Sequence, residues 1–299
     1  MGFVGRHVMH RLSVDYPDTL LFAPAIDVRD ADDVVAAVRQ AAPDVCIHLA
    51  AVSSIRAADE DADHAWKVNL HGTLHMARAI MRYAPECQML HVSSADAYGS
   101  SFRAGTPVDE SVALAPMSVY GATKAAADLA VGSMAAQGLR CIRLRPFNHT
   151  GPGQSAQFVV AAFARQIARI EAGLQPPLMQ VGNLETWRDF LDVRDVSAGY
   201  LGCIARRDSL IPGSIVNLAS GNPRRIADIL ADLQDFAAVQ LDVRIDPARV
   251  RGGDVPIACG DATRARELLG WIPAIPWRQT LQDALDDWRA RIRTDAQES

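Results

Sequence analysis

The sequence predicts a doubly wound α/β fold, in which a parallel sheet carries helices on both faces. Three observations predict it. Short apolar runs alternate with longer segments of helical periodicity, and the apolar runs are continuous, as in strands that are buried on both faces. In addition, 49% of the 299 residues are hydrophobic, which is enough for a large core. Strands and helices that alternate in this way form a parallel sheet.

The elements follow in order along the chain. Strands are predicted at residues 20–23, 45–49, 89–92, 141–144 and 215–218. Helices are predicted at residues 31–42, 63–83, 117–137, 157–172, 226–237, 263–269 and 277–291. Prolines and glycines after Arg145 interrupt the regular alternation, which indicates a second, smaller and mostly helical lobe. We expect a dinucleotide-binding domain at 1–147 plus about 183–221, and a substrate lobe at 148–182 plus about 222–299.

Composition and charge exclude several classes of protein. The chain has 30 Lys and Arg against 35 Asp and Glu, a net charge of −5 without the basic excess of nucleic-acid-binding proteins. The longest apolar run, residues 158–164, is far shorter than the roughly 20 residues that span a bilayer. Five scattered cysteines without CxxC spacing are typical of a reduced cytoplasmic protein. His71 and His75 are spaced as zinc ligands can be, but no Cys or carboxylate cluster accompanies them, so no metal site is predicted.

Two motifs can carry chemistry. Tyr120 and Lys124 lie four residues apart in a predicted helix, so both occupy one face, and an ammonium near a phenol lowers the phenol pKa towards the range of a proton donor. Alone, such a pair can also be an ordinary surface pair. Ser94 follows a predicted strand, at the sheet edge where this fold binds ligands. There it can orient a substrate carbonyl, or it can simply be a turn serine.

Longer motifs connect these residues. They are Gly2-Phe3-Val4-Gly5, His48-Leu49-Ala50-Ala51, Asn69 with Gly72-Thr73, Ser93 through Gly99, Tyr120 through Lys124, and Arg145-Pro146-Phe147-Asn148. On these motifs, the whole chain resembles extended short-chain dehydrogenases/reductases of the NAD-dependent epimerase/dehydratase family, which act on nucleotide sugars through a Rossmann fold. The runs 145–154, 158–169 and 188–196 are most similar to members that reduce the C4 keto group of GDP-4-dehydro-6-deoxy-D-mannose, giving GDP-D-rhamnose.

The resemblance implies roles for individual residues. Tyr120 would protonate the C4 oxygen, Lys124 would hold the nicotinamide ribose, and Ser94 would orient the carbonyl. The implied cofactor-binding residues are Gly2, Phe3, Val4, Gly5, Asp27, Val28, Leu49, Ala50, Ala51, Asn69, Tyr120 and Lys124. The implied substrate-binding residues are Ser94, Asp96, Asn148, Arg188 and Arg251, the two arginines at the diphosphate. An ion pair with Asp189 or Asp192 is the alternative for Arg188.

Alternatives to reduction remain at this point. Dehydratases of the family carry a glutamate two residues after the catalytic Ser or Thr. Here that residue is Asp96, whose side chain is one methylene shorter. The shorter side chain favours reduction and leaves dehydration of GDP-mannose as the second candidate. A 4-epimerase shares the same three catalytic residues. A dinucleotide sensor without activity is the non-enzyme alternative, although such proteins typically lose the Tyr or Lys.

The cofactor and the assembly are also expectations. Pro24-Ala25-Ile26, after the second predicted strand, offers neither the acid typical of NAD binding nor an arginine for NADP, and we expect NADPH, with NADH tolerated. The family suggests a homodimer joined through the helix at 117–137. Family members begin with a strand and a TGxxGFxG turn, of which only Gly2 and Gly5 remain here. We therefore expect a missing first strand and an exposed strand edge beside it.

Overall fold

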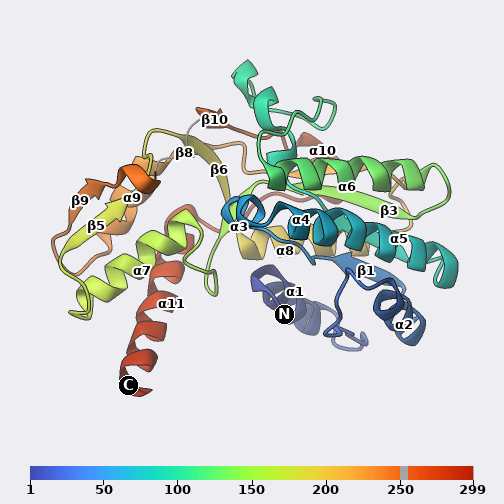
Figure 1. The fold of residues 1–299 in the computed structure, drawn as a ribbon, viewed down its shortest axis with the longest axis horizontal. Helices are drawn as coiled ribbons and strands as arrows, with labels where there is room; N and C mark the ends of the chain where they lie inside the picture. Colours follow the sequence, from blue (N-terminus) through green and yellow to red (C-terminus); the bar gives the residue numbers. More distant parts are fainter. Residues whose placement is uncertain (250–254, 299) are drawn as a thin grey trace.

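The computed structural model describes residues 1–249 and 255–298. At its centre is a four-stranded parallel sheet in the order β1-β2-β3-β7 (Figure 1). Its strands are β1 (Val45–His48), β2 (Gln88–Val92), β3 (Cys141–Pro146) and β7 (Ile215–Leu218). All three pairings are parallel. The carboxyl ends of these strands therefore lie along one edge, where an open sheet of this kind binds its ligands.

Helices cover both faces of this sheet, which confirms the doubly wound α/β class. One face packs against α1 (Phe3–Asp15), α8 (Val193–Ala205) and α10 (Thr263–Leu269). The other packs against α2 (Ala31–Ala41), α5 (Gly72–Tyr83) and α6 (Val119–Ala135). The strands bury apolar side chains on both sides, such as Leu90 on the α8 side and Met89 on the α5 side. The continuous apolar runs of the sequence reflect this double burial.

Short helices lie between β1 and α6. The helix predicted at 63–83 is three consecutive pieces: α4 (Ala62–Trp66), the π-helical turn η1 (Lys67–His71) and α5. Before it comes α3 (Ile55–Glu60), and after β2 come the 3₁₀ turns η2 (Ala95–Ala97) and η3 (Gly99–Ala104). Single π-turns inside α-helices are frequent at functional sites. The π-turn here contains Asn69, one of the predicted site residues.

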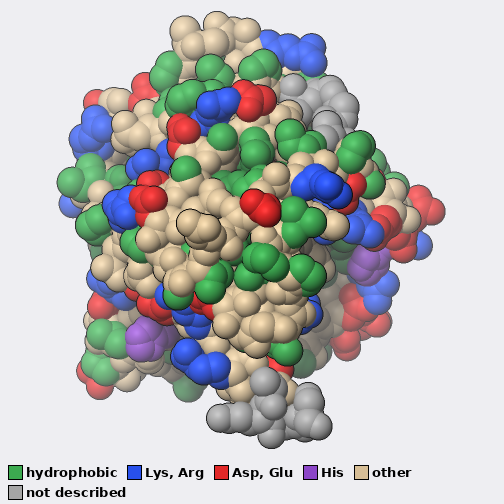
Figure 2. Space-filling view, turned by 90° about the vertical axis from the view of Figure 1, so that its left-hand side faces the viewer, with side chains coloured by type: hydrophobic (Ala, Val, Ile, Leu, Met, Phe, Trp, Pro, Cys, Tyr) green, Lys and Arg blue, Asp and Glu red, His purple; other side chains and the backbone are tan. Residues whose placement is uncertain are grey.

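The second group of elements has its own apolar core. It consists of α7 (Val159–Glu171), α9 (Ile226–Asp235) and α11 (Trp277–Glu298) with the parallel pair β5 (Leu178–Val181) and β9 (Asp242–Ile245). Figure 1 shows it beside the main sheet. On its outer face, acidic, basic and apolar side chains are interspersed (Figure 2). That face carries no field of one sign that would attract a polyanion.

A small mixed sheet lies between the two groups. Its strands are β4 (Asn148–Thr150), β6 (Trp187–Asp192), β8 (Pro223–Arg225) and β10 (Ile257–Ala258), and the 3₁₀ turn η4 (Pro247–Arg249) precedes β10 in the chain. The order is β10-β6-β4, and β8 pairs with β6 in the antiparallel sense. Asn148 and Arg188, two of the predicted substrate residues, lie on adjacent strands of this sheet.

One predicted strand is wrong. Residues 20–23 form no strand, and Leu20 is 92% exposed. A strand requires a neighbour with which to exchange backbone hydrogen bonds, and none of the described residues provides one. The chain enters α1 at Phe3, and β1 pairs with β2 alone, so β1 is an edge strand of the described sheet. No helix within the described part of the chain is both long and apolar enough to cross a membrane.

Candidate active site

Ser94 and Tyr120 meet beyond the carboxyl end of β2. Ser94 follows that strand and caps η2, because its Oγ accepts a hydrogen bond from the Asp96 backbone N at 3.1 Å. Tyr120 lies in the first turn of α6, which starts where the Ser118 Oγ accepts from the Gly121 backbone N at 3.0 Å. The Tyr120 hydroxyl faces the Ser94 side chain, which is close enough to lower the pKa of the phenol. Two residues 26 positions apart in the sequence are thus brought together.

Gly121 permits this close approach of α6 to η2. A Cβ on Gly121 would lie 2.7 Å from the backbone oxygen of Asp96 and 3.2 Å from the side chain of Pro116. The obstacle at 2.7 Å is backbone, which cannot swing aside as a flexible side chain can. A larger residue at position 121 would push the first turn of α6 away from Ser94. The glycine after the tyrosine is therefore part of the construction of the site.

Lys124 lies one turn after Tyr120 on the same helix and is buried. Its Nζ donates a hydrogen bond to the backbone oxygen of Val92, at the end of β2. Burial lowers the pKa of Lys124 to about 8, while the Asp128 carboxylate, one turn further along, acts in the opposite direction. Lys124 therefore presents an ammonium at the strand end where Ser94 and Tyr120 meet, and that ammonium can lose its proton in mildly alkaline solution.

The pKa of Tyr120 differs from our prediction. We expected Lys124 to lower it. In the structure burial raises this pKa well above its usual value, the negative charge of Asp96 raises it further, and only the Ser94 side chain acts in the opposite direction. The physical reason is that Lys124 is directed to the Val92 carbonyl and the phenol is removed from water. Tyr120 is accordingly held in its protonated form, the form that a proton donor must have.

Asn69 is fully buried and binds two other parts of the site. Its Oδ1 accepts from the backbone N of Val52 at 2.8 Å, and its Nδ2 donates to the Val52 backbone oxygen at 3.1 Å and to the Thr123 Oγ1 at 2.9 Å. We predicted a cofactor contact for Asn69. In the structure its amide bonds to Val52 and Thr123, and so fixes the loop after β1 against α6, beside Lys124.

The residues predicted to bind the cofactor lie around the beginning of α1. Gly2 is the N-cap of this helix, and no side chain caps it. A Cβ on Gly5 would lie 3.8 Å from Leu49, so the glycine motif adjoins the segment Leu49–Ala51 that follows β1. Phe3 and Val4 occupy the first turn. Residues 2–5 and the end of β1 therefore form one contiguous surface at the carboxyl edge of the sheet.

Asp27 and Val28 are placed differently from one another. Asp27 is exposed, and its carboxylate is hydrogen bonded to the Arg29 side chain, which lowers the Asp27 pKa to about 2. Val28 is buried and packs on α5, where a Cβ on Gly72 would lie 2.7 Å from the valine side chain. Asp27 thus carries a full negative charge at neutral pH, already paired with a neighbouring arginine.

The residues predicted to bind substrate lie on β4 and β6. Asn148 is exposed at the start of β4. Arg188, on β6, donates to the backbone oxygens of Trp187 and Val255 at 2.8 and 3.0 Å. The alternative for Arg188 was an ion pair with Asp189 or Asp192, and both carboxylates have other partners. Asp189 accepts hydrogen bonds from Ser220, Gly221 and Gly260, and Asp192 accepts one from Arg194. Arg251 lies outside the described residues.

An aromatic contact connects the cofactor-side and substrate-side residues. The rings of Phe3 and His149 are stacked, with centroids 6.3 Å apart and planes at 8°. The His149 Nδ1 lies 2.9 Å from the backbone oxygen of Phe147, and the His7 Nε2 lies 2.7 Å from that of Pro152. The glycine motif and β4 are therefore neighbours in space, although about 145 residues separate them in the sequence.

Sequence reasoning missed a buried network behind the site. Asp128 forms a bidentate pair with Arg145, at 2.9 and 3.0 Å, and is also bonded to Arg143 at 3.0 Å. Arg145 donates to the Tyr98 hydroxyl at 2.9 Å, and Tyr98 donates to Asn217 at 2.8 Å. The network ties α6 to β3 and β7. Its only signal in the sequence was the position of Asp128, four residues after Lys124 on one helix face.

Comparisons with known proteins agree with this geometry. The family model described as GDP-mannose 4,6 dehydratase matches residues 2–284. The GDP-6-deoxy-D-mannose reductase of Pseudomonas aeruginosa is 35% identical over 297 residues, 98% of this chain and 96% of the relative. The GDP-mannose 4,6-dehydratase of Sinorhizobium fredii is 26% identical, over 85% of this chain and 77% of its own length.

Solved structures show the same fold. The structure of RMD from Pseudomonas aeruginosa complexed with NADPH superposes with a TM-score of 0.89 at 33% identity, covering 97% of this chain and 96% of that one. The UDP-glucose 4-epimerase of Thermus thermophilus, in complex with NAD, has a TM-score of 0.83 at 24% identity, covering 96% of each chain. From the match of the family model along nearly the whole sequence and the likeness to the reductase, we conclude that the chain belongs to the GDP-mannose 4,6-dehydratase family.

Proposed function

We propose that this protein reduces the C4 keto group of GDP-4-dehydro-6-deoxy-D-mannose to give GDP-D-rhamnose, with NADPH as the preferred reductant and NADH tolerated. The observation that carries the proposal is the buried convergence of Ser94 and protonated Tyr120 beside Lys124. It occurs in a chain that is 35% identical to a GDP-6-deoxy-D-mannose reductase. The same residues oppose the sensor alternative, since a protein that only binds a dinucleotide needs no proton donor.

The beginning of α1 suits a dinucleotide. The first-turn amides of a helix are hydrogen-bond donors at the positive end of its dipole, and here no side chain caps them. A Cβ on Gly2 would meet nothing within 4 Å, so the approach to those amides is open. We assign the pyrophosphate to Gly2–Gly5, with Leu49–Ala51 beside it, and the dinucleotide domain to 1–147 plus about 183–221. The bound nicotinamide cofactor supplies the hydride.

The protein residues then handle the proton and the carbonyl. Ser94 donates a hydrogen bond to the C4 oxygen and holds it towards Tyr120. The Tyr120 hydroxyl gives its proton to that oxygen as negative charge develops on it. The Lys124 ammonium, held at the end of β2 by the Val92 carbonyl, binds the ribose of the cofactor. Burial of all three side chains excludes water and so strengthens each of these interactions.

The sugar nucleotide is assigned to the second lobe, 148–182 plus about 222–299. Asn148 is exposed at the start of β4, close to the ring of His149 that stacks on Phe3, and we place it at the sugar nucleotide. Arg188 is half-buried on the adjacent strand β6 and is assigned to the diphosphate, which suits a guanidinium fork. Arg251 keeps the same assignment from the sequence pattern.

Dehydration of GDP-mannose is the second candidate. The Asp96 carboxylate is close enough to raise the pKa of Tyr120, so an additional acid–base group is present at the site. Water loss across C5 and C6 needs such a group, and a side chain one methylene shorter than glutamate is poorly placed for it. We therefore keep reduction first. A 4-epimerase would share these residues, but no feature of the site favours it over the reductase.

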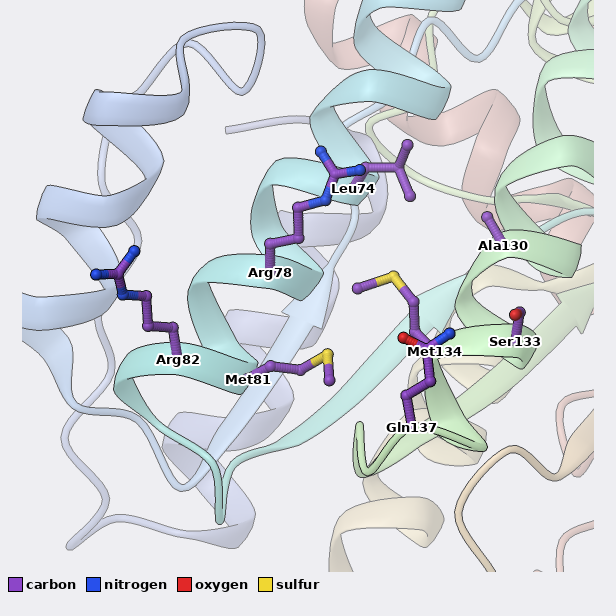
Figure 3. Close-up of a pocket in the computed structure, with 8 residues that line it drawn as sticks. All are labelled: Leu74, Arg78, Met81, Arg82, Ala130, Ser133, Met134 and Gln137. Carbon is purple, nitrogen blue, oxygen red and sulfur yellow. The ribbon is translucent and has the colours of Figure 1, made fainter.

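Assembly and location are parts of the same proposal. A groove between α5 and α6 is lined by Leu74, Arg78, Met81, Arg82, Ala130, Ser133, Met134 and Gln137 (Figure 3). Leu129, which precedes Ala130 on α6, is 60% exposed. We propose that this surface, on the helix predicted for the interface, joins two copies of the chain.

An enzyme that consumes NADPH and a sugar nucleotide is placed in the cytoplasm.

The direct test is turnover. Purified protein is mixed with GDP-4-dehydro-6-deoxy-D-mannose and NADPH, and the cofactor absorbance is followed while the sugar product is identified by NMR. We expect stoichiometric loss of NADPH and formation of GDP-D-rhamnose. Incubation with GDP-mannose and oxidised cofactor is the parallel arm. Water loss there, with no consumption of NADPH in the first arm, would replace the reductase by the dehydratase.

A further inference from the structure

Two arginines face each other across the small sheet. β6 and β8 are antiparallel, and their register places Arg188 directly opposite Arg224. Side chains of directly opposed residues project on the same face, and like charges so placed destabilise the pair. Arg225, the next residue, projects on the other face and is ion-paired with Glu185. The register therefore places two arginines side by side at positions 188 and 224.

The Arg224 guanidinium is held by an aromatic surface. Its central carbon lies 4.9 Å from the centroid of the Trp277 ring, and Trp277 in turn packs on Phe190 with centroids 5.6 Å apart. Stacking on an aromatic ring fixes the plane of a guanidinium without using its N–H donors. Arg224 is thus ordered, and its hydrogen-bonding capacity is preserved.

Part of the hydrogen-bonding capacity of Arg224 is buried and has no partner. Among the described residues, neither the Arg224 Nε nor the neighbouring Trp277 Nε1 has a hydrogen-bond partner, although both atoms are inaccessible to solvent. A buried donor without an acceptor costs roughly 1–3 kcal/mol, so native proteins rarely leave one. Two such donors lie side by side here. An acceptor-rich group at this place would satisfy both.

Nearby carboxylates are engaged elsewhere. Asp189 accepts from the backbone N atoms of Ser220, Gly221 and Gly260. Asp232 is bonded to Arg278 at 3.1 Å. Burial lowers the pKa of Arg224, although the negative charges of Asp232 and Asp189 act in the opposite direction. Within the described part of the chain, neither acid is a hydrogen-bond partner of Arg224, whose charge is therefore available to an anion from outside the protein.

We propose that Arg224 is a second diphosphate-binding residue, which acts with Arg188 across the β6–β8 pair to grip the phosphoryl oxygens of the sugar nucleotide. The inference rests on the proposed function, because it takes the ligand of Arg188 to be the diphosphate of a GDP-sugar. Arg224 presents its fork edge-on to the anion while Trp277 supports its face. Specificity for a nucleoside diphosphate over a nucleoside then depends on position 224 as well as 188.

The test compares Arg224→Gln with Arg225→Gln, which removes an adjacent arginine that already has a protein partner. Binding of GDP, guanosine, inorganic diphosphate and NADPH is measured by calorimetry on the full chain. For Arg224→Gln we expect GDP and diphosphate binding to weaken by about tenfold or more, since a charged hydrogen bond is lost. Guanosine and NADPH binding should stay unchanged, and Arg225→Gln should match wild type in all four titrations.

Unaltered GDP affinity in Arg224→Gln overturns the inference, and so does an equal loss of GDP and guanosine, which would indicate a merely structural role. Arg224→Lys is the second variant: it keeps the charge and the stem but not the fork, and intermediate GDP affinity is expected. If wild type binds diphosphate through Arg224 but does not turn over the keto sugar, the proposed reaction fails and the anion site stands. If wild type binds neither GDP nor diphosphate, both fail.

Discussion

The Tyr120 hydroxyl faces the Ser94 side chain, and both residues are buried beyond the carboxyl end of β2. This relationship joins the first turn of α6 to the turn after a central strand, and Gly121 makes the approach possible. It places a protonated phenol and a hydroxyl where one carbonyl oxygen can contact both. The predictions below follow from it and from the residues that hold it in place.

Tyr120→Phe should lower kcat by at least about 10²–10⁴-fold, the usual contribution of a positioned acid. Binding of NADPH and of GDP should change little, because the ring and its packing are retained. Single-turnover kinetics and calorimetry measure the two quantities. Substantial remaining turnover would remove Tyr120 from the role of proton donor.

Activity should fall as the pH rises through about 8. Burial lowers the Lys124 pKa to about 8, so the ammonium is present below that pH and is lost above it. The pKa of Tyr120 is raised, so the proton donor stays protonated over the same range. A kcat/KM profile of the free enzyme reports this decline. Lys124→Arg should retain its charge and lack the alkaline decline; a decline that persists in this variant would belong to another group.

Asp96→Asn should reduce the keto sugar within about tenfold of the wild-type rate, because reduction needs no second acid–base group. A loss of about a hundredfold or more, the usual effect of removing such a group, would indicate that Asp96 takes part in the chemistry. Steady-state kinetics with both GDP-mannose and the keto sugar separate the two outcomes. The same measurement decides between the reductase and the dehydratase at the level of one residue.

Asn69→Ala should destabilise the fold by about 1–3 kcal/mol for each buried group left without a partner, since the Val52 backbone and the Thr123 hydroxyl lose their hydrogen bonds. Urea unfolding measures this difference. The rate should also fall, because α6 and the loop after β1 lose their connection. Asn222→Ala, which removes an exposed amide with only local hydrogen bonds, is the control and should leave both stability and rate unchanged.

The fold could be predicted where periodicity and burial agree. β1, β2, β3 and β7 lie at the predicted apolar runs, and α10 has the predicted bounds. Residues 20–23 failed because an apolar run predicts burial, whereas a strand also needs a neighbouring backbone. The π-turn at 67–71 was invisible because its residues continue the helical pattern.

The sequence predicts which residues converge at the site better than it predicts their pKa values. Ser94, Tyr120 and Lys124 converge as the motifs indicated, but the direction of the Tyr120 pKa depends on burial and on where the Lys124 ammonium points. Spacing along a helix says nothing of either. The Arg188 and Arg224 pair was likewise hidden, because strand register brings together residues 36 positions apart in the sequence.

The most direct test of the central claim is the fate of the hydride. Wild-type protein is incubated with GDP-4-dehydro-6-deoxy-D-mannose and NADPH carrying deuterium at the transferred position, and the product is examined by NMR. We predict one deuterium at C4 of a GDP-linked rhamnose and consumption of one cofactor for each sugar. Unchanged cofactor, or a product that carries no deuterium at C4, would contradict the account.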